Sequence, residues 1–397
     1  MPTLSPRLSF WTAAAVAGIV LWSSGAPTIV YPLYAAAWHL TTAVTTLIFA
    51  IYPLALIPVL LVFGNLSDYI GRRAAILIGL ATLLLGTAAF GVAPDLGWVL
   101  AGRVLMGAGV GIALSPATAA MIEFGGPDRA QRASSATTAS TATGLALATL
   151  VGGALVQYAP APMHLTFWML VAVIVVVGTA ALFLPRHTPD EAQGRWAPRL
   201  PAVPRGLRRG FLAGATGISS AYAVGAVFLA MGAEIARQLV RSQNAFVDGA
   251  IISISAVTIG VVAILSRRLA PAVAMTIGPF AMAAGLASLI GAATWHSIAW
   301  FIVASLLTGT GYSLMFSGGL GIITATAPAH HRAGVISAAY TVGYFIQAAA
   351  ALGLGAVATA SGLLLALELG AIVLVALAVA ALLLARLRRR EPASVTA

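Results

Sequence analysis

The stretch VAVIVVVGTAALFL, from Val171 to Leu184, contains no charged residue and shows no alternation of polar with apolar side chains. A strand of a transmembrane barrel would alternate over about 10 residues. A helix, in contrast, crosses a hydrocarbon core of about 30 Å with about 20 mostly apolar residues. The stretch therefore predicts a membrane-spanning helix.

Similar apolar stretches recur along all 397 residues. The twelve expected spans cover residues 9–34, 41–63, 74–93, 97–121, 134–158, 165–184, 209–233, 245–265, 271–293, 297–323, 333–358 and 362–385. The first span is too long, and is followed by too many others, to be a cleaved signal peptide. The predicted fold class is an all-α polytopic membrane protein.

The composition supports a chain that lies in lipid. Hydrophobic residues make up 60% of it and charged residues only 8%, which is too little charge to cover a water-facing surface. The net charge of +11 does not indicate a nucleic-acid partner, because the basic residues lie between apolar stretches and form no face of their own. The absence of cysteine excludes a disulfide framework and a cysteine metal site.

The basic residues also predict the orientation. All 21 are arginine, and 18 of them fall at one set of loops and both termini, whereas the opposite side has only Arg237 and Arg241. Because arginine accumulates on the cytoplasmic side, both termini are expected there. Arginine-only, alanine-rich usage is typical of a GC-rich bacterial genome, so we expect a bacterial cytoplasmic (inner) membrane.

The spans divide into two groups of six. Residues 185–209 form a polar stretch with six arginines, and we expect residues 185–208 to be a cytoplasmic linker that attracts anionic lipid headgroups. It separates an N-terminal half, residues 1–184, from a C-terminal half, residues 209–397. Gly107 and Gly109 recur as Gly309 and Gly311, an offset of 202 residues. Parallel six-helix repeats of this kind place a substrate site between them, near the membrane midplane.

The loop after the second span reads GNLSDYIGRR, from Gly64 to Arg73. It resembles the signature loop of the major facilitator superfamily, G-x-L-a-D-x-x-G-[RK]-[RK], and it falls between the same two spans. The matching residues are Gly64, Leu66, Asp68, Gly71, Arg72 and Arg73. The span count and the central linker extend the resemblance, in particular to twelve-helix bacterial exporters of drugs or metabolites, over essentially the whole chain.

This resemblance implies a conformational latch. In the family the loop holds the two halves together in the outward-facing state, with the aspartate at the start of the eleventh span and an arginine on an acid at the end of the fourth. Asp68 would be held ionised by Arg72 or Arg73. Glu123 is the candidate partner of the arginine; the alternative is a solvated carboxylate at a helix end.

Arg103 lies inside the fourth span, about 7 to 8 Å from its outer side at 1.5 Å per residue. The segment RVLMGAGVG resembles the family's fourth-helix pattern, whose arginine is implicated in proton transfer. Intramembrane charges are costly and usually face a cavity or a partner. Arg103 is therefore a candidate contact for an anionic substrate group or a nearby carboxylate, and the alternative is snorkelling to the outer interface.

Other candidates lie toward the outer ends of the spans. Glu234, Arg237 and Arg241 share one helix face, as a solvated face or an outer gate, with Asp248 opposite at the start of the eighth span. Glu234 and Asp248 are the candidates for a titratable acid near an outward-open cavity. Glu368, early in the last span, is expected to be structural or interfacial.

Uncharged side chains suggest what the cavity holds. Spaced aromatic, Met and Gln residues are expected on the helices that line a transport path, and they suit a moderately apolar small molecule. For each of them, plain packing is the alternative. These candidates are Tyr31, Tyr222, Tyr312, Met315, Tyr340, Tyr344 and Gln347.

No metal-binding, nucleotide-binding or paired-carboxylate motif occurs within a span, so neither an enzyme nor an ATP-driven pump is expected, and no cofactor is expected. We expect a secondary transporter, monomeric as is usual in the family, that exports a small, largely apolar compound in exchange for protons. The alternative is an uptake permease or facilitator for a small organic anion that uses Arg103. Many exporters of the family carry an acid in the first helix, and this chain has none there. The central Gly-Pro of the family's antiporter pattern is also missing from the fifth helix. Both departures weaken the assignment of proton antiport.

Overall fold

The computed structural model describes residues 3–63, 66–125, 129–186, 203–326 and 329–389. All regular elements in these ranges are helical. The first half contains α1 (Pro6–Gly25), α2 (Tyr31–Trp38), α3 (Thr42–Phe63), α4 (Ser67–Ile70), α5 (Arg72–Gly91), α6 (Leu96–Phe124), α7 (Arg129–Tyr158) and α8 (Leu165–Ala181). The second half contains η1 (Arg205–Leu207), α9 (Arg208–Ala226), η2 (Val227–Met231), α10 (Gly232–Gln238), α11 (Ala245–Leu265), η3 (Ser266–Arg268), α12 (Pro271–Thr294), α13 (Ile298–Thr326), α14 (Ala329–Ser361) and α15 (Leu363–Arg389).

The helices have the length and composition that a membrane requires. In the described ranges, eleven helical segments are long and apolar enough to span a bilayer, and α8, with 17 residues, is a shorter apolar helix. The prediction of an all-α polytopic membrane protein is confirmed. The expected linker 185–208 falls mainly on residues 187–202, which lie outside the described residues.

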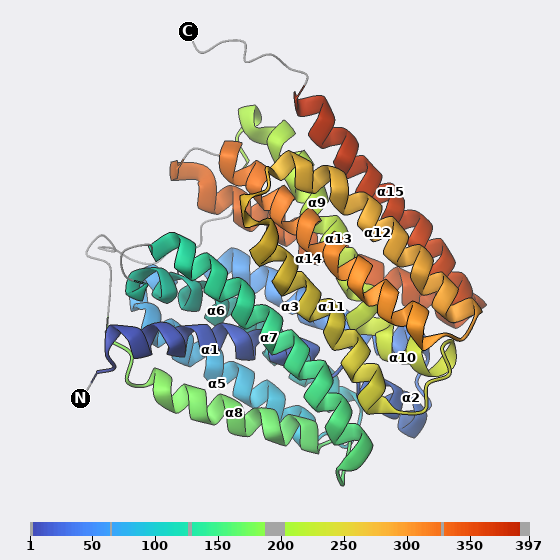
Figure 1. The fold of residues 1–397 in the computed structure, drawn as a ribbon. Helices are drawn as coiled ribbons and strands as arrows, with labels where there is room; N and C mark the ends of the chain where they lie inside the picture. Colours follow the sequence, from blue (N-terminus) through green and yellow to red (C-terminus); the bar gives the residue numbers. More distant parts are fainter. Residues whose placement is uncertain (1–2, 64–65, 126–128, 187–202, 327–328, 390–397) are drawn as a thin grey trace.

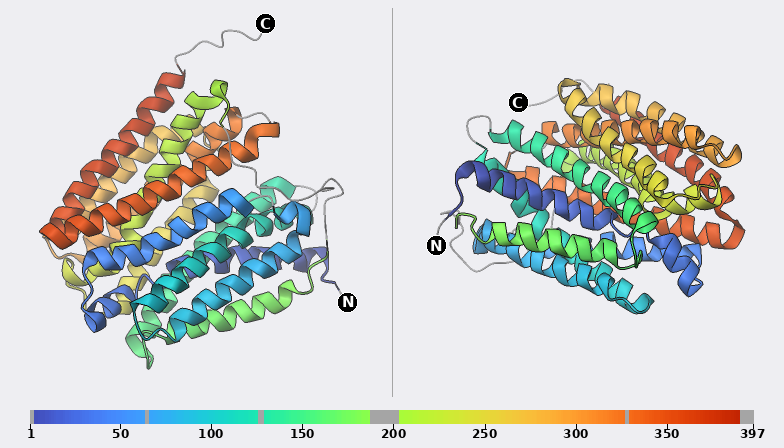
Figure 2. Two further views of the ribbon diagram at one scale, coloured as in Figure 1. Left: turned by 180° about the vertical axis from the view of Figure 1, so that it is seen from behind. Right: turned by 60° about the horizontal axis from the view of Figure 1, so that its bottom comes forward.

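The helices assemble into two bundles (Figures 1 and 2). In the first, α1 packs on α6 and α7, and α5 packs on α6 and α8. In the second, α9 packs on α13, α14 and α15, and α12 packs on α13. The bundles meet along two helix pairs, α7 with α11 and α3 with α14. Figure 1 shows the bundles diverging toward the end where α1 begins and α15 ends.

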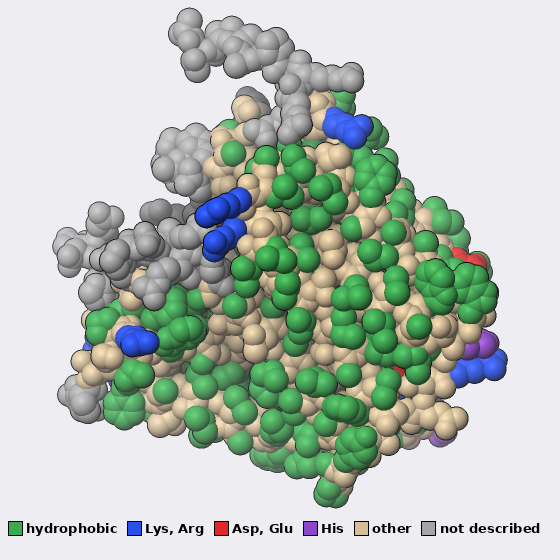
Figure 3. Space-filling view, viewed as in Figure 1, with side chains coloured by type: hydrophobic (Ala, Val, Ile, Leu, Met, Phe, Trp, Pro, Cys, Tyr) green, Lys and Arg blue, Asp and Glu red, His purple; other side chains and the backbone are tan. Residues whose placement is uncertain are grey.

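The surface is apolar where lipid is expected. Large side chains such as Leu85, Val176 and Ile372 are exposed on the outward faces of the bundles. Figure 3 shows hydrophobic side chains across the visible face, with most charged side chains near its margins. In water this surface would be unfavourable, whereas hydrocarbon solvates it without cost.

The first expected span, 9–34, is not one helix. The helix α1 ends at Gly25, residues 26–30 form turns, and α2 begins at Tyr31. Pro27 has no N–H for an intrahelical bond, and Pro32 disfavours a helical conformation in the residue before it. The prediction of a continuous helix was wrong because it relied on the apolar content of the segment and gave too little weight to these two prolines.

The seventh span is also interrupted. Residues 209–233 were expected as one helix, but a π-helical segment, η2, separates α9 from α10, and the helix continues to Gln238. π-segments are rare and occur frequently at functional sites. Here the segment lies where the bundles approach each other, because the Thr28 hydroxyl donates a hydrogen bond of 2.9 Å to the carbonyl of Leu229.

Several hydrogen bonds join the bundles at the end opposite to the start of α1 and the end of α15. The Thr42 hydroxyl donates to Glu234 Oε1 at 2.9 Å, and the Ala43 N–H donates to Thr359 Oγ1 at 2.8 Å. The Ala245 N–H donates to Gln157 Oε1 at 2.9 Å. Together with the bond between Thr28 and Leu229, these contacts define what we call the closed end.

The closed end depends on close backbone approach. Gly249 of α11 lies against the carbonyl of Thr149 in α7, and a Cβ at this position would have no room. We expect Gly249→Val to force α7 and α11 apart and to open the closed end more often. In this cysteine-free chain, a single cysteine at Thr149 should then react several-fold faster with a membrane-impermeant maleimide applied from that side.

The matched control for this experiment is Gly178→Val, because a Cβ at Gly178 meets nothing within 4 Å. Its labelling rate should equal that of the parent. Equal rates in the Gly178 and Gly249 variants, both folded by thermal melting, would show that helix approach at Gly249 does not control the closed end.

Candidate functional site

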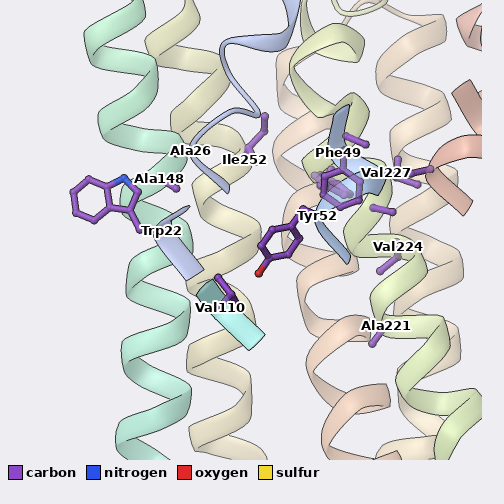
Figure 4. Close-up of a cluster of buried hydrophobic side chains, with 14 of the residues drawn as sticks. Trp22, Ala26, Phe49, Tyr52, Val110, Ala148, Ala221, Val224, Val227 and Ile252 are labelled. Atoms are coloured by element: carbon purple, nitrogen blue, oxygen red, sulfur yellow. The ribbon is translucent and has the colours of Figure 1, made fainter. Parts of the chain in front are cut away.

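A cavity of about 110 Å³ lies between the two bundles. Its walls come from α1, α3 and α7 on one side and from α9, η2, α11, α13 and α14 on the other. Four of the residues expected from the sequence line it: Tyr222, Tyr312, Tyr344 and Gln347. In Figure 4 the ring of Tyr52 lies within the buried cluster, with Trp22 and Val110 on one side of it and Val224 and Val227 on the other.

Several lining residues were not anticipated as site residues. They are Ser24, Tyr52, Thr149, Phe228, Ser255 and Thr308, among others. Small hydroxyl residues within apolar spans give no periodic signal, so the sequence offered little to find most of them. Tyr52 is different, because it directly precedes Pro53 inside α3. A proline within a helix marks a kink, and this signal could have drawn attention to Tyr52.

The cavity wall is electrically neutral. Among the described lining residues, none is Asp, Glu, Arg or His, and the polar groups are hydroxyls, one amide and backbone. Polar groups of this kind can pair with uncharged donors and acceptors. A bare charge would find no counter-ion here, which makes its transfer from water unfavourable.

Five aromatic rings of the second bundle gather at the cavity. We call Tyr222, Tyr312, Phe316, Tyr340 and Tyr344 the tyrosine stack. The ring centroid of Tyr222 lies 4.8 Å from that of Tyr344 and 5.8 Å from that of Phe316. Phe316 and Tyr340 lie 6.0 Å apart with planes only 7° apart. Tyr340 thus belongs to the same cluster as the lining tyrosines.

Two expected residues do not reach the cavity. Met315 is fully buried, packs against Gly217 of α9 and Gly278 of α12, and does not line the cavity in this conformation, so its role as a substrate contact stays a prediction. Its position three residues after Tyr312 turns it toward the neighbouring helices. Tyr31 is buried at the start of α2, and its hydroxyl has no hydrogen-bond partner among the described residues.

Arg103 lies behind the cavity wall. Its side chain is fully buried and donates from Nε to the carbonyl of Ile48 at 3.0 Å, from one terminal nitrogen to Ser24 at 3.3 Å and from the other to Phe49 at 3.4 Å. The guanidinium carbon lies 4.8 Å from the ring centroid of Tyr52. Snorkelling to the outer interface does not occur, and the structure does not bring Arg103 into the cavity.

Helix interruptions explain why Arg103 points inward. Pro53 cannot donate to the carbonyl of Phe49, four residues earlier in α3. The Thr28 N–H bonds Gly25 and leaves the carbonyl of Ser24 without its usual helical donor. In lipid such carbonyls must find a donor inside the protein. The guanidinium supplies it and joins α1, α3 and α6.

A charged cluster lies at the end where the bundles diverge. Arg72 pairs with Asp68 Oδ1 at 2.5 Å and with Glu123 Oε1 at 3.1 Å, so the expected contact between a loop arginine and Glu123 is present. Arg73 instead donates to the carbonyl of Leu184 at 3.3 Å. Gly71, with a φ of 85°, forms the turn between α4 and α5.

Two parts of the expected latch lie outside the described residues. One is Gly64. The other is the set of side chains at residues 327–334, at the start of α14, which Asp68 would meet.

The remaining acids lie toward the closed end. Glu234 accepts hydrogen bonds of 2.9 Å from Thr42 of the first bundle and from Gln238. Asp248 is 2% exposed, and its Oδ1 has no hydrogen-bond partner in the described chain. Neither lines the cavity in this conformation. Glu368 is half-buried on α15 and stands apart from both.

No group of three His, Asp or Glu side chains that could hold a metal ion occurs among the described residues. The geometry consists instead of two bundles, a neutral cavity between them and contacts that close one end. Such an arrangement defines a polytopic membrane protein that passes small molecules between its halves.

Comparison with known proteins identifies the family. The model of the Major Facilitator Superfamily matches residues 10–351, and the chain belongs to this superfamily. It is therefore a transporter of small molecules and not an enzyme. No curated protein sequence matches the chain.

Solved structures agree on the fold. A bacterial homologue of the human lysosomal transporter Spinster, inward-facing and unoccupied, gives a TM-score of 0.77 at 15% identity and covers 98% of this chain and 99% of its own. Its inward-facing occupied form gives 0.70 at 16% identity, with 98% of each chain covered. A variant of the nucleoside transporter NupG gives 0.76 at 12% identity, with 96% of this chain and 100% of its own covered. At these identities only the fold is shared.

The role of Arg103 predicts a stability effect. Arg103→Ala removes the donor from three buried carbonyls, so we expect the free energy of unfolding to fall by about 3 kcal/mol. Thermal melting of the purified protein in detergent measures this loss. Arg237→Ala, which removes an exposed arginine, should melt like the parent. Equal melting of both variants would show that Arg103 does not join the three helices.

Proposed function

We propose that this transporter exports a small, largely apolar organic molecule in exchange for protons. The observation that carries the proposal is the neutral cavity between the bundles, lined by tyrosines, aliphatic side chains and hydroxyls. Apolar walls with a few polar groups are typical of sites for compounds of this kind. The alternative, uptake of a small organic anion on Arg103, has less support because the donors of Arg103 are engaged by backbone carbonyls behind the wall.

Glu234 and Asp248 are the proposed proton carriers. Glu234 is part of the closed end through Thr42, so binding a proton there weakens an acceptor that joins the bundles. Asp248 lies at the start of α11, which packs on α7 of the first bundle. We call this contact between the bundles at the closed end the seam. Protonation from the outside would therefore accompany opening of the closed end, and proton release inside would accompany return to the present state.

We further propose the setting in which this exchange occurs. The protein would lie in a bacterial inner membrane as a monomer with both termini in the cytoplasm, since arginine gathers on the side of the termini. The divergence of the bundles toward the termini then makes this conformation inward-facing, like that of the two Spinster-homologue structures.

Coupling is tested in proteoliposomes that contain a pH-sensitive dye. A transported compound, found first by a growth-resistance screen across chemical classes, should drive proton flux when added to one side. Glu234→Gln should lower this flux at least about tenfold while counterflow of labelled substrate continues. Glu368→Gln, at an acid on α15, which packs on α9, α12 and α14 of its own bundle, should keep the flux. Transport that is indifferent to an imposed pH gradient would contradict the proton exchange.

The loop charges are proposed to act as a latch. Gly64, Asp68, Gly71, Arg72, Arg73 and Glu123 would hold the outward-facing state, in which Asp68 meets the start of α14. We expect Asp68→Asn to shift the population toward inward-facing conformations, because the neutral amide binds a cationic or dipolar partner less strongly. Accessibility of a single cysteine at the closed end should fall. Asp95→Asn is the control, since Asp95 caps α6 at the other end and Asn caps equally well. An unchanged accessibility in the Asp68 variant would remove the latch.

A further inference from the structure

The two walls of the cavity differ in chemistry. The second bundle contributes Tyr222, Tyr312, Tyr344 and Phe228, whereas the facing wall from α1 and α7 contributes Leu21, Ser24, Leu145 and Thr149. Most aromatic rings of the cavity therefore come from the second bundle, and Tyr52 of α3 adds one from the first bundle. A ligand in this space meets aromatic side chains mainly on the side of the second bundle.

Two rings of the stack pack directly against glycines, where no side chain separates the ring from the neighbouring backbone. A Cβ on Gly343 of α14 would lie 2.9 Å from the ring of Tyr222, and a Cβ on Gly225 would lie 3.2 Å from the ring of Tyr312. These glycines let each ring rest directly on a neighbouring helix. The planes of Tyr222 and Tyr312 are 29° apart, and those of Tyr222 and Phe316 are 18° apart. The rings of Tyr222, Tyr312 and Phe316 are thus close to parallel, whereas the ring of Tyr344 is tilted by 45° to that of Tyr222.

The stack also extends from the cavity toward the end where the bundles diverge. Tyr344 lines the cavity, and Tyr340 lies one helical turn closer to the start of α14. Phe316 lies one turn beyond Tyr312 in α13, in the same direction, and stacks on Tyr340. The aromatic cluster therefore continues from the cavity wall toward the diverging end.

Charge decides between planar ligands. The guanidinium of Arg103 lies over Tyr52, a wall residue, and no carboxylate forms an ion pair with it in the described chain. The carbonyls around Arg103 satisfy its hydrogen bonds but do not cancel its charge. No lining residue carries a negative charge either. At low effective dielectric, a positive charge in the cavity is repelled by Arg103.

We propose that the cavity binds a planar aromatic molecule without positive charge, stacked on the tyrosine stack, with its heteroatoms toward the hydroxyls and amide of the wall. This inference rests on the proposed function in one respect: both assign ligand binding to the cavity between the bundles. It names the ligand class: neutral aromatic compounds with carbonyl, ether or ring-nitrogen acceptors. Aliphatic compounds of equal size gain burial but lose the ring stacking.

The probes are chosen to differ in one property at a time. Neutral 6-methoxyquinoline is compared with the cation 6-methoxy-N-methylquinolinium and with 6-methoxydecahydronaphthalen-2-one, a neutral saturated bicyclic ketone of similar size. Saturable binding of tritiated 6-methoxyquinoline to the full-length purified protein in detergent is measured by scintillation proximity, with the other two as competitors. We expect saturable binding of the quinoline and competition at least about tenfold weaker from each of the others.

Substitutions at Tyr222 and Tyr344 test whether the ligand binds on the tyrosine stack. Tyr222→Leu and Tyr344→Leu should each weaken quinoline binding about tenfold, whereas Tyr222→Phe and Tyr344→Phe keep the ring and should bind within about twofold of the parent. Phe345→Leu is the matched control, because Phe345 follows Tyr344 in α14 but is 58% exposed on the outer face. Where a leucine variant does not fold by thermal melting, the partner variant at the other tyrosine decides.

The outcomes separate the ligand class from the transport function. Equal or stronger competition by the cation, absence of saturable quinoline binding, or unchanged binding in both leucine variants would overturn the inference. Proton-coupled transport of a compound of another class, combined with any of these results, would leave the exporter function standing. The expected binding pattern without proton flux for any compound would retain the ligand class and remove the proton exchange.

Discussion

The hydrogen bonds of Arg103 to backbone carbonyls are the interaction on which the arrangement of the first bundle depends. A lipid environment supplies no donors, so each interruption of a spanning helix must be compensated by the protein itself. This chain interrupts α1 after Gly25 and α3 at Pro53, and both interruptions fall beside the same guanidinium. One buried cation thereby permits two irregular helices to line the cavity, and Tyr52 and Ser24 take their places in the wall because of it.

The second constraint is that the bundles touch closely at one end and diverge at the other. At the closed end, small residues and hydroxyl groups let α7 approach α11, and Thr28 and Thr42 reach across to η2 and α10. The hydrogen bonds across this end come from hydroxyl, amide and carboxylate side chains, beside the close packing of α7 on α11. A seam of this kind can open without disturbing either bundle, since rigid halves rocking about a central site is how parallel-repeat transporters alternate access. The π-segment η2 lies where the cavity meets this seam.

Much of the fold followed from the sequence because lipid enforces a simple rule. Long apolar stretches become helices, and the predicted 245–265 corresponds closely to α11. The failures occurred where local chemistry competes with apolar content: Pro27 and Pro32 broke the first span, and η2 interrupted the seventh. For the site, the tyrosines at helical spacing were informative, since Tyr222, Tyr312 and Tyr344 line the cavity. The direction of Met315 and the inward turn of Arg103 were not predictable, because they depend on which neighbouring backbone each helix meets.

In the proposed exchange, the separation of charge from the cavity would let one chain combine an apolar ligand with a proton drive. The acids Glu234 and Asp248 lie toward the seam, and Arg72, Asp68 and Glu123 lie at the diverging end, whereas the described lining residues are uncharged. A carboxylate inside the wall would bind its proton and attract cations at the same place. With the acids outside the wall, the proposed protonation would act on the contacts between bundles and not on the ligand. In this proposal, coupling would pass through conformation alone, and the tyrosine stack and the positive charge of Arg103 would determine which ligands bind.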